Sequence, residues 1–80
     1  MATVLKKPEE LKVSTNVTGT PLAITKNGKT ERITRIYQSW HVSEKLSTQE
    51  ITKNYFKVRT GKGLVYDIYH DTNSSLWYLG

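Results

Sequence analysis

The stretch from Lys53 to Gly80 most restricts what this chain can fold into. Apolar and polar residues alternate in the runs 54–60 and 64–70, and a short third run follows at 76–79. Alternation with a period of two is typical of strands with one buried face. The stretch also contains six of the eight aromatic residues: Tyr55, Phe56, Tyr66, Tyr69, Trp77 and Tyr78. It therefore predicts three antiparallel strands that supply most of a core.

The register of the first two of these strands follows from the glycine-rich turn at 61–63. A three-residue loop places Val58 opposite Tyr66 and Lys57 opposite Asp67, whereas a two-residue loop would pair apolar with charged residues. The predicted inner face consists of Phe56, Val58, Leu64, Tyr66 and Ile68. The predicted outer face consists of Tyr55, Lys57, Arg59, Val65, Asp67 and Tyr69.

A second hairpin is indicated by the Asn27-Gly28 dipeptide between two runs suited to strands, 22–26 and 29 onward. Asn-Gly favours a type I′ turn, because both central residues of that turn need positive φ. This turn pairs Lys26 with Lys29 and Ile24 with Glu31.

The run that follows, 30–42, is too long for one flat strand. Its apolar residues change parity between Ile33 and Ile36, which predicts a β-bulge or sharp bend at that point. A single bulge would keep Ile33, Ile36, Trp40 and Val42 directed inward.

The flanking segments complete a predicted all-β domain at 11–80, after a flexible leader at 1–10. Alternation at 11–15 indicates a first strand at a sheet edge. The sequence Ser47-Thr48-Gln49-Glu50 fits a helix capping box, so we expect a loop with one helical turn in the segment 43–52. Five to six short strands with tight turns predict a small antiparallel curled sheet or barrel, SH3-like or OB-like.

Composition limits the alternatives to one small domain of 80 residues without cysteine, which excludes disulfides and thiolate metal sites. No run approaches the roughly 18 apolar residues of a transmembrane helix, and the N-terminus lacks the apolar segment of a signal peptide. We therefore expect a cytoplasmic protein that does not bind membranes. Eight aromatic residues are enough for a core, so we expect a monomer.

The order of residues in the last third resembles a known pattern. It runs Tyr55-Phe56-Lys57-Val58-Arg59-Thr60, Gly63, Tyr66-Asp67-Ile68-Tyr69-His70-Asp71 and Trp77-Tyr78-Leu79. This is similar to a family of small bacterial domains of unknown function with the pattern YFxVxT…G…YDIYxD…WYL. The resemblance covers about residues 20–80 and extends to Trp40, where some members also have tryptophan. It implies a shared fold, and it supplies no catalytic or binding residues.

The charge balance, twelve basic against seven acidic residues for a net +5, favours contact with a polyanion. On the predicted outer face, Tyr55 and Tyr69 lie beside Lys57 and Arg59, with Lys62 in the adjacent turn. Aromatic residues among cations are how small β-barrels hold single-stranded nucleic acid. We therefore expect a non-catalytic binding module for single-stranded nucleic acid, or for a protein that processes nucleic acid, in which these five residues form the site.

The same sequence features also fit two different roles. The Tyr55–Tyr69 pair is an ordinary means of stabilising a sheet. The protein could instead be an interaction or subunit module that pairs through an exposed edge strand at 11–15. Salt separates these modes, because only nucleic-acid binding releases counterions and weakens steeply with salt.

No residue pattern supports catalysis, a cofactor or a small-molecule substrate. Asp67, His70 and Asp71 are metal-ligand types, but a strand directs the two carboxylates to one face and the imidazole to the other. His41 is not accompanied by a nucleophile motif, and the 61–63 loop lacks the spacing of a phosphate-binding loop. We expect neither an enzyme nor a metal site.

Overall fold

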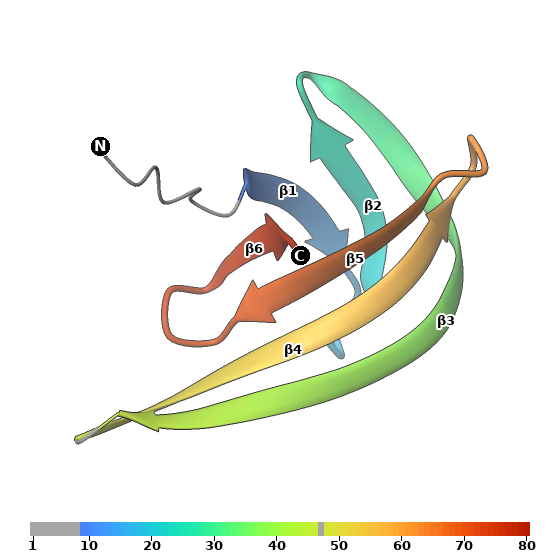
Figure 1. Cartoon of the computed structure of the whole chain (residues 1–80). Helices are drawn as coiled ribbons and strands as arrows, with labels where there is room; N and C mark the ends of the chain where they lie inside the picture. Colours follow the sequence, from blue (N-terminus) through green and yellow to red (C-terminus); the bar gives the residue numbers. More distant parts are fainter. Residues whose placement is uncertain (1–8, 47) are drawn as a thin grey trace, which may run out of the picture.

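The computed structural model describes residues 9–46 and 48–80, in which six antiparallel strands form a closed barrel (Figure 1). The strands are β1 (Glu9–Thr15), β2 (Pro21–Lys26), β3 (Lys29–Leu46), β4 (Gln49–Thr60), β5 (Val65–Asp71) and β6 (Leu76–Leu79). Each strand pairs with the next, and β6 pairs with β1 to close the barrel. The predicted all-β class and small-barrel architecture are confirmed. In the same residues, no helix is long and apolar enough to cross a membrane.

The first strand joins β2 to β6 and so closes the barrel, but among the described residues 12–15 pair on one side only, with β2. The edge position predicted for 11–15 is therefore wrong only in part. Its first half, Glu9–Leu11, pairs with β6, and its second half, Lys12–Thr15, pairs with β2. The strand begins at Glu9, so two residues assigned to the leader at 1–10 belong to the barrel. The other eight residues of that leader lie outside the described residues.

Both predicted hairpin turns are confirmed. Asn27 and Gly28 have φ values of 52° and 75°, and β2 pairs with β3 in the expected register. The β4–β5 turn is closed by the Thr60 amide, which donates to the Leu64 carbonyl at 2.9 Å. Leu64 itself is 46% exposed, so its predicted place on the inner face is wrong. It lies in the turn before β5 begins, where the barrel wall no longer covers it.

The third strand contains two irregularities in its pairing with β4, not one. The register shifts between Ile33 and Arg35, as predicted, and again between Ile36 and Gln38. The second shift reverses the parity once more, so Trp40 lies opposite the outer-face residue Tyr55. The prediction that Trp40 and Val42 point inward is therefore wrong, and they are 37% and 40% exposed.

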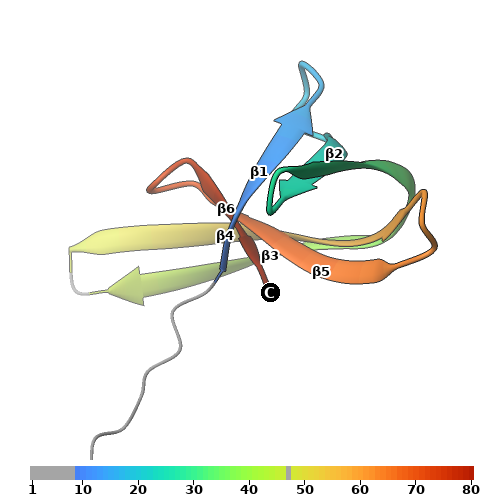
Figure 2. The ribbon, with the colours of Figure 1, turned by 90° about the horizontal axis from the view of Figure 1, so that it is seen from above.

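The segment 43–52 is a strand hairpin, and the predicted loop with a helical turn is wrong. Pairs continue along β3 and β4 from Ser43 with Thr52 to Leu46 with Gln49. The proposed capping residue Ser47 lies outside the described residues, while Gln49 and Glu50 are in β4. Pairing with β3 satisfies the backbone groups that a helical turn would otherwise satisfy. The paired ends of β3 and β4 extend beyond the barrel as an arm (Figure 2).

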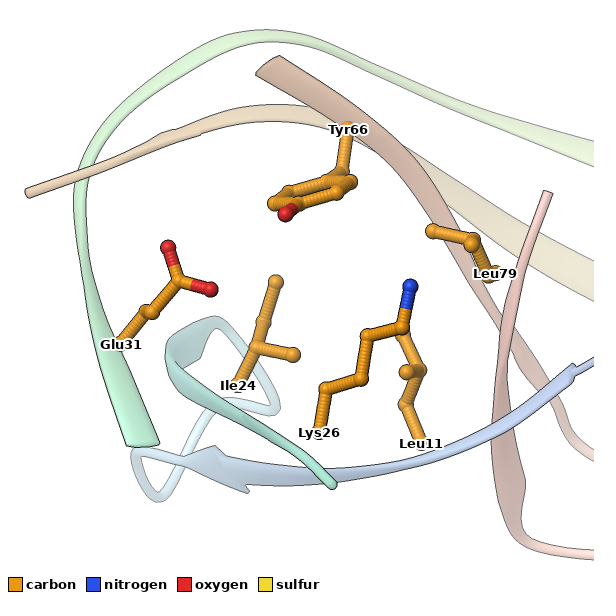
Figure 3. Close-up of a pocket in the computed structure, with 6 residues that line it drawn as sticks. All are labelled: Leu11, Ile24, Lys26, Glu31, Tyr66 and Leu79. Carbon is orange, nitrogen blue, oxygen red and sulfur yellow. The ribbon is translucent and has the colours of Figure 1, made fainter. Parts of the chain in front are cut away.

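The barrel interior is filled by side chains. Five buried residues form the core: Leu11, Ile24, Val58, Ile68 and Trp77. Toward the β2–β3 side, Lys26 and Glu31 line the interior together with Tyr66, and the space between them has no room for a water molecule (Figure 3). The charged groups have partners, because the Lys26 ammonium lies 3.4 Å from Glu9 and the Glu31 carboxylate accepts a hydrogen bond from Thr60. This part of the interior therefore offers no space for a ligand.

Candidate nucleic-acid interface

A row of four aromatic side chains crosses the outer face of the barrel from β3 to β6. Trp40, Tyr55, Tyr69 and Tyr78 are directly opposite one another on successive strands. The rings of Trp40 and Tyr55 are stacked, with centroids 5.3 Å apart and planes at 6°. Tyr55 and Tyr69 have centroids 5.0 Å apart, and those of Tyr69 and Tyr78 are 5.3 Å apart. We call these four residues the aromatic row.

Tyr69 lies at the centre of the aromatic row and is only 7% exposed. Tyr55 and Tyr78 pack on either side of it, and the Lys53 ammonium lies 5.4 Å from the centre of its ring. Burial raises the pKa of the Tyr69 hydroxyl, and the positive charge of Lys53 partly opposes this rise. These contacts leave no ring face of Tyr69 for a base, so its place is structural.

Tyr55 is half-buried and has neighbours on both ring faces, Trp40 and Tyr69. The backbone of Gly80 also approaches it, since a Cβ on that glycine would lie 3.5 Å from Cε1 of Tyr55. The side chain can therefore present an edge to a ligand, but not a free stacking surface.

The cations predicted for the site are exposed on the same face. Lys57 and Arg59 alternate with the buried inner-face residues of β4. Arg35 is not among the residues predicted for the site, yet it lies on β3 directly opposite Arg59 of β4. Its guanidinium lies over the ring of Tyr37, 5.6 Å from the centroid. The pairing of β3 with β4 thus adds a third cation to the face.

The β4–β5 turn places Lys62 at the end of this surface. Nη2 of Arg59 lies 3.7 Å from the position that a Cβ would take on Gly63, so the guanidinium is directed toward the same turn. We call the four cations Arg35, Lys57, Arg59 and Lys62 the basic patch. Lys57 lies opposite Asp67 as predicted. In residues 9–46 and 48–80, however, the one ion pair within 4.0 Å is Lys26 with Glu9, so the basic patch is not neutralised by close ion pairs.

The acidic and histidine residues of β5 do not converge. Asp67 and Asp71 lie opposite the outer-face residues Lys57 and Lys53, whereas the ring of His70 packs against Trp77 on the inner face, 4.9 Å away. The predicted divergence of these side chains is confirmed. Within the described part of the chain, no group of three potential metal ligands comes together.

Comparison of the chain with protein-family models, with curated proteins and with solved structures gives no match.

Proposed function

We propose that this protein is a non-catalytic cytoplasmic binding module that holds single-stranded nucleic acid on the basic patch. Arg35, Lys57, Arg59 and Lys62 provide the cations, and the aromatic row lies on the same face of the barrel.

The observation that supports this proposal most directly is the pairing of Arg35 with Arg59. Like charges directly opposite each other on a sheet destabilise it, by roughly 0.2–1 kcal/mol for such a cross-strand pair. The guanidinium group of Arg35 lies over the ring of Tyr37, and that of Arg59 is directed toward Gly63. A phosphate backbone lying between β3 and the β4–β5 turn would remove this repulsion, since each phosphate brings one negative charge.

The geometry favours contacts with phosphates over contacts with bases. Tyr69 is buried and Tyr55 offers only an edge, so neither provides the free ring face on which a base stacks. Phosphate contacts position a nucleic acid without reading its sequence. Binding should therefore be independent of sequence and strongly dependent on salt.

The test is a fluorescence-anisotropy titration of a labelled single-stranded DNA of mixed sequence. Three or four phosphate contacts give a slope of about −2 to −3 in a plot of log K against log salt for single strands. The affinity should then fall about 20- to 50-fold between about 50 and 200 mM salt. Replacing Tyr55 by Leu should change the affinity little.

The decisive variant is Lys57→Glu with Arg59→Glu, and Lys12→Glu with Lys29→Glu is its matched control. Both pairs are exposed and change the net charge equally, but Lys12 and Lys29 lie on β1 and after the β2–β3 turn. The first double variant should abolish binding, while the control should retain most of it. Equal losses in both would show that net charge alone attracts the DNA, and no binding at low salt would refute the proposal.

A further inference from the structure

One side of β3 has no strand beside it over most of its length. The strand pairs with β2 only at Lys29–Arg32, while its pairing with β4 runs from Ile33 to Leu46. Among the described residues, the backbone of 33–46 therefore has no partner on the side away from β4. Figure 1 shows β4 lying between β5 and β3, with β3 outermost. We call this side of β3 the free edge.

Natural proteins protect such edges with bulges, charges or proline, because unpaired N–H and C=O groups can pair with another chain. The two register shifts of β3 lie before Gln38, so they make only the first part of the free edge irregular. From Gln38 to Ser43 the strand is regular and contains no proline, lysine, arginine or acidic residue. On its outer face this segment exposes Trp40 and Val42. The free edge is thus open over six residues without lysine, arginine or acidic side chains, and two of the six, Trp40 and Val42, are apolar.

We propose that this edge pairs antiparallel with the same edge of a second copy of the chain, in the register that places His41 opposite His41. This register is chosen by the side chains. In this register Trp40 of each copy lies opposite Val42 of the other copy, so the pair occurs twice. A pair of an aromatic and a β-branched residue is favourable across two strands. A shift centred on Val42 would set Trp40 opposite Glu44, and a shift centred on Trp40 would set Val42 opposite Gln38.

The aromatic row gives a second reason for choosing a second copy as the occupant. The row ends at Trp40, which stacks on Tyr55 with one ring face and is 37% exposed at the free edge. In the proposed register, Val42 of the second copy covers that end, and the two rows become one apolar band across the dimer. The isologous arrangement uses each contact twice, as a two-fold dimer must.

The charge of the chain predicts how this dimer responds to salt. Each copy carries a net +5, so long-range repulsion opposes association and is screened as salt rises. Dimerisation should therefore stay constant or strengthen with salt, whereas nucleic-acid binding on the basic patch should weaken. The two proposals are independent, and each can fail without the other.

The first experiment is sedimentation velocity of the full chain without DNA, from micromolar to submillimolar concentration. The mass should rise from 9.2 kDa toward twice that value, with more dimer at the higher salt. Val42→Lys should weaken the dimer about tenfold or more, because symmetry places the substitution at the interface twice. Val17→Lys is the matched control, since Val17 is fully exposed in the β1–β2 turn and should not affect the dimer.

A second experiment tests the register through disulfide crosslinking, for which the cysteine-free chain is suited. His41→Cys places two thiols directly opposite each other across the two-fold axis, at about 4.5–5.5 Å between Cβ atoms. Ser39→Cys places the two thiols four residues apart along the paired strands, too far for a disulfide. Under mild oxidation the first variant should form a covalent dimer and the second should not.

Three results would overturn the proposal. If the chain stays monomeric at every concentration, a second copy does not bind the free edge, and a segment of a different protein would be the next partner to test. A dimer that Val42→Lys does not weaken more than Val17→Lys would lie elsewhere on the barrel. Crosslinking of Ser39→Cys as fast as His41→Cys would exclude the proposed register.

Discussion

Thr60→Val tests the energetic role of a polar contact within the barrel. Thr60 is 1% exposed at the end of β4, and its hydroxyl donates to Oε1 of Glu31 on β3 at 2.8 Å. Valine keeps the shape of the side chain but removes the donor. Hydrogen bonds to charged groups contribute about 1.5–3 kcal/mol. Glu31 is only half-buried, so water can partly replace the hydroxyl, and we expect a loss near the lower limit, about 1.5–2 kcal/mol.

This loss is large for so small a domain. A core of this size contributes about 3–5 kcal/mol in all, so the variant should lose about 30% or more of its stability. The melting temperature should fall by about 6–16 °C, at about 4–8 °C for each kcal/mol. Circular dichroism at neutral pH during heating, together with urea unfolding, measures both quantities.

A double-mutant cycle with Glu31→Ala separates the hydrogen bond from general packing. When the acceptor is absent, the Thr60 hydroxyl has lost its partner, and replacing it by a methyl group should cost little or should stabilise the protein. The coupling energy should therefore be about 1 kcal/mol or more. If Thr60→Val costs the same in both backgrounds, the hydroxyl does not act through Glu31 and the reasoning is wrong.

Two further predictions concern a turn and the aromatic row. Gly28→Ala should lower the free energy of unfolding by about 1–2 kcal/mol in urea titrations, because φ is +75° and the added Cβ meets no neighbour that could compensate. Gly61→Ala, where φ is not positive and the contacts are ordinary, should be neutral or stabilising, and equal losses would contradict this assignment. Burial raises the pKa of Tyr69 above 10.0 in the folded state, so above that pH the unfolded state loses the proton first and stability falls as pH rises. Tyr69→Phe should remove this part of the loss of stability at alkaline pH. The measurement is the change in the urea midpoint between about pH 9 and 11, and an unchanged pH dependence in the variant would refute the role of Tyr69.

Local features of this fold could be predicted from the sequence because each depends on residues close together in the chain. The Asn27-Gly28 turn requires positive φ at two adjacent positions, and the observed values agree. The register of β4 with β5 follows from a three-residue loop and the pairing of apolar with apolar residues. The exposure of Lys57 and Arg59 follows from the same alternation.

The segment 43–52 shows where local patterns fail. Its polar residues fit a capping box, but pairing between β3 and β4 satisfies the same backbone groups along the whole arm. That pairing begins at the barrel, where Trp40 stacks on Tyr55, and continues outward. Strand pairing along the arm therefore overrode the preference for a capped helical turn.

The sequence alone was enough to predict that this chain forms strands, that tight turns lie at 27–28 and 61–63, and which residues of β4 and β5 face outward. Three other features depend on contacts between distant parts of the chain: the closure by β1, the burial of Tyr69 and the pairing of Arg35 with Arg59. The face on which Trp40 lies, next to Tyr55 in the aromatic row, could not be predicted either. Alternation repeats every two residues, so one extra residue between Ile36 and Trp40 exchanges the inner and outer faces of the residues that follow. Which face is chosen depends on partners distant in sequence. Closure likewise depends on Glu9–Leu11 meeting β6, at the opposite end of the described chain.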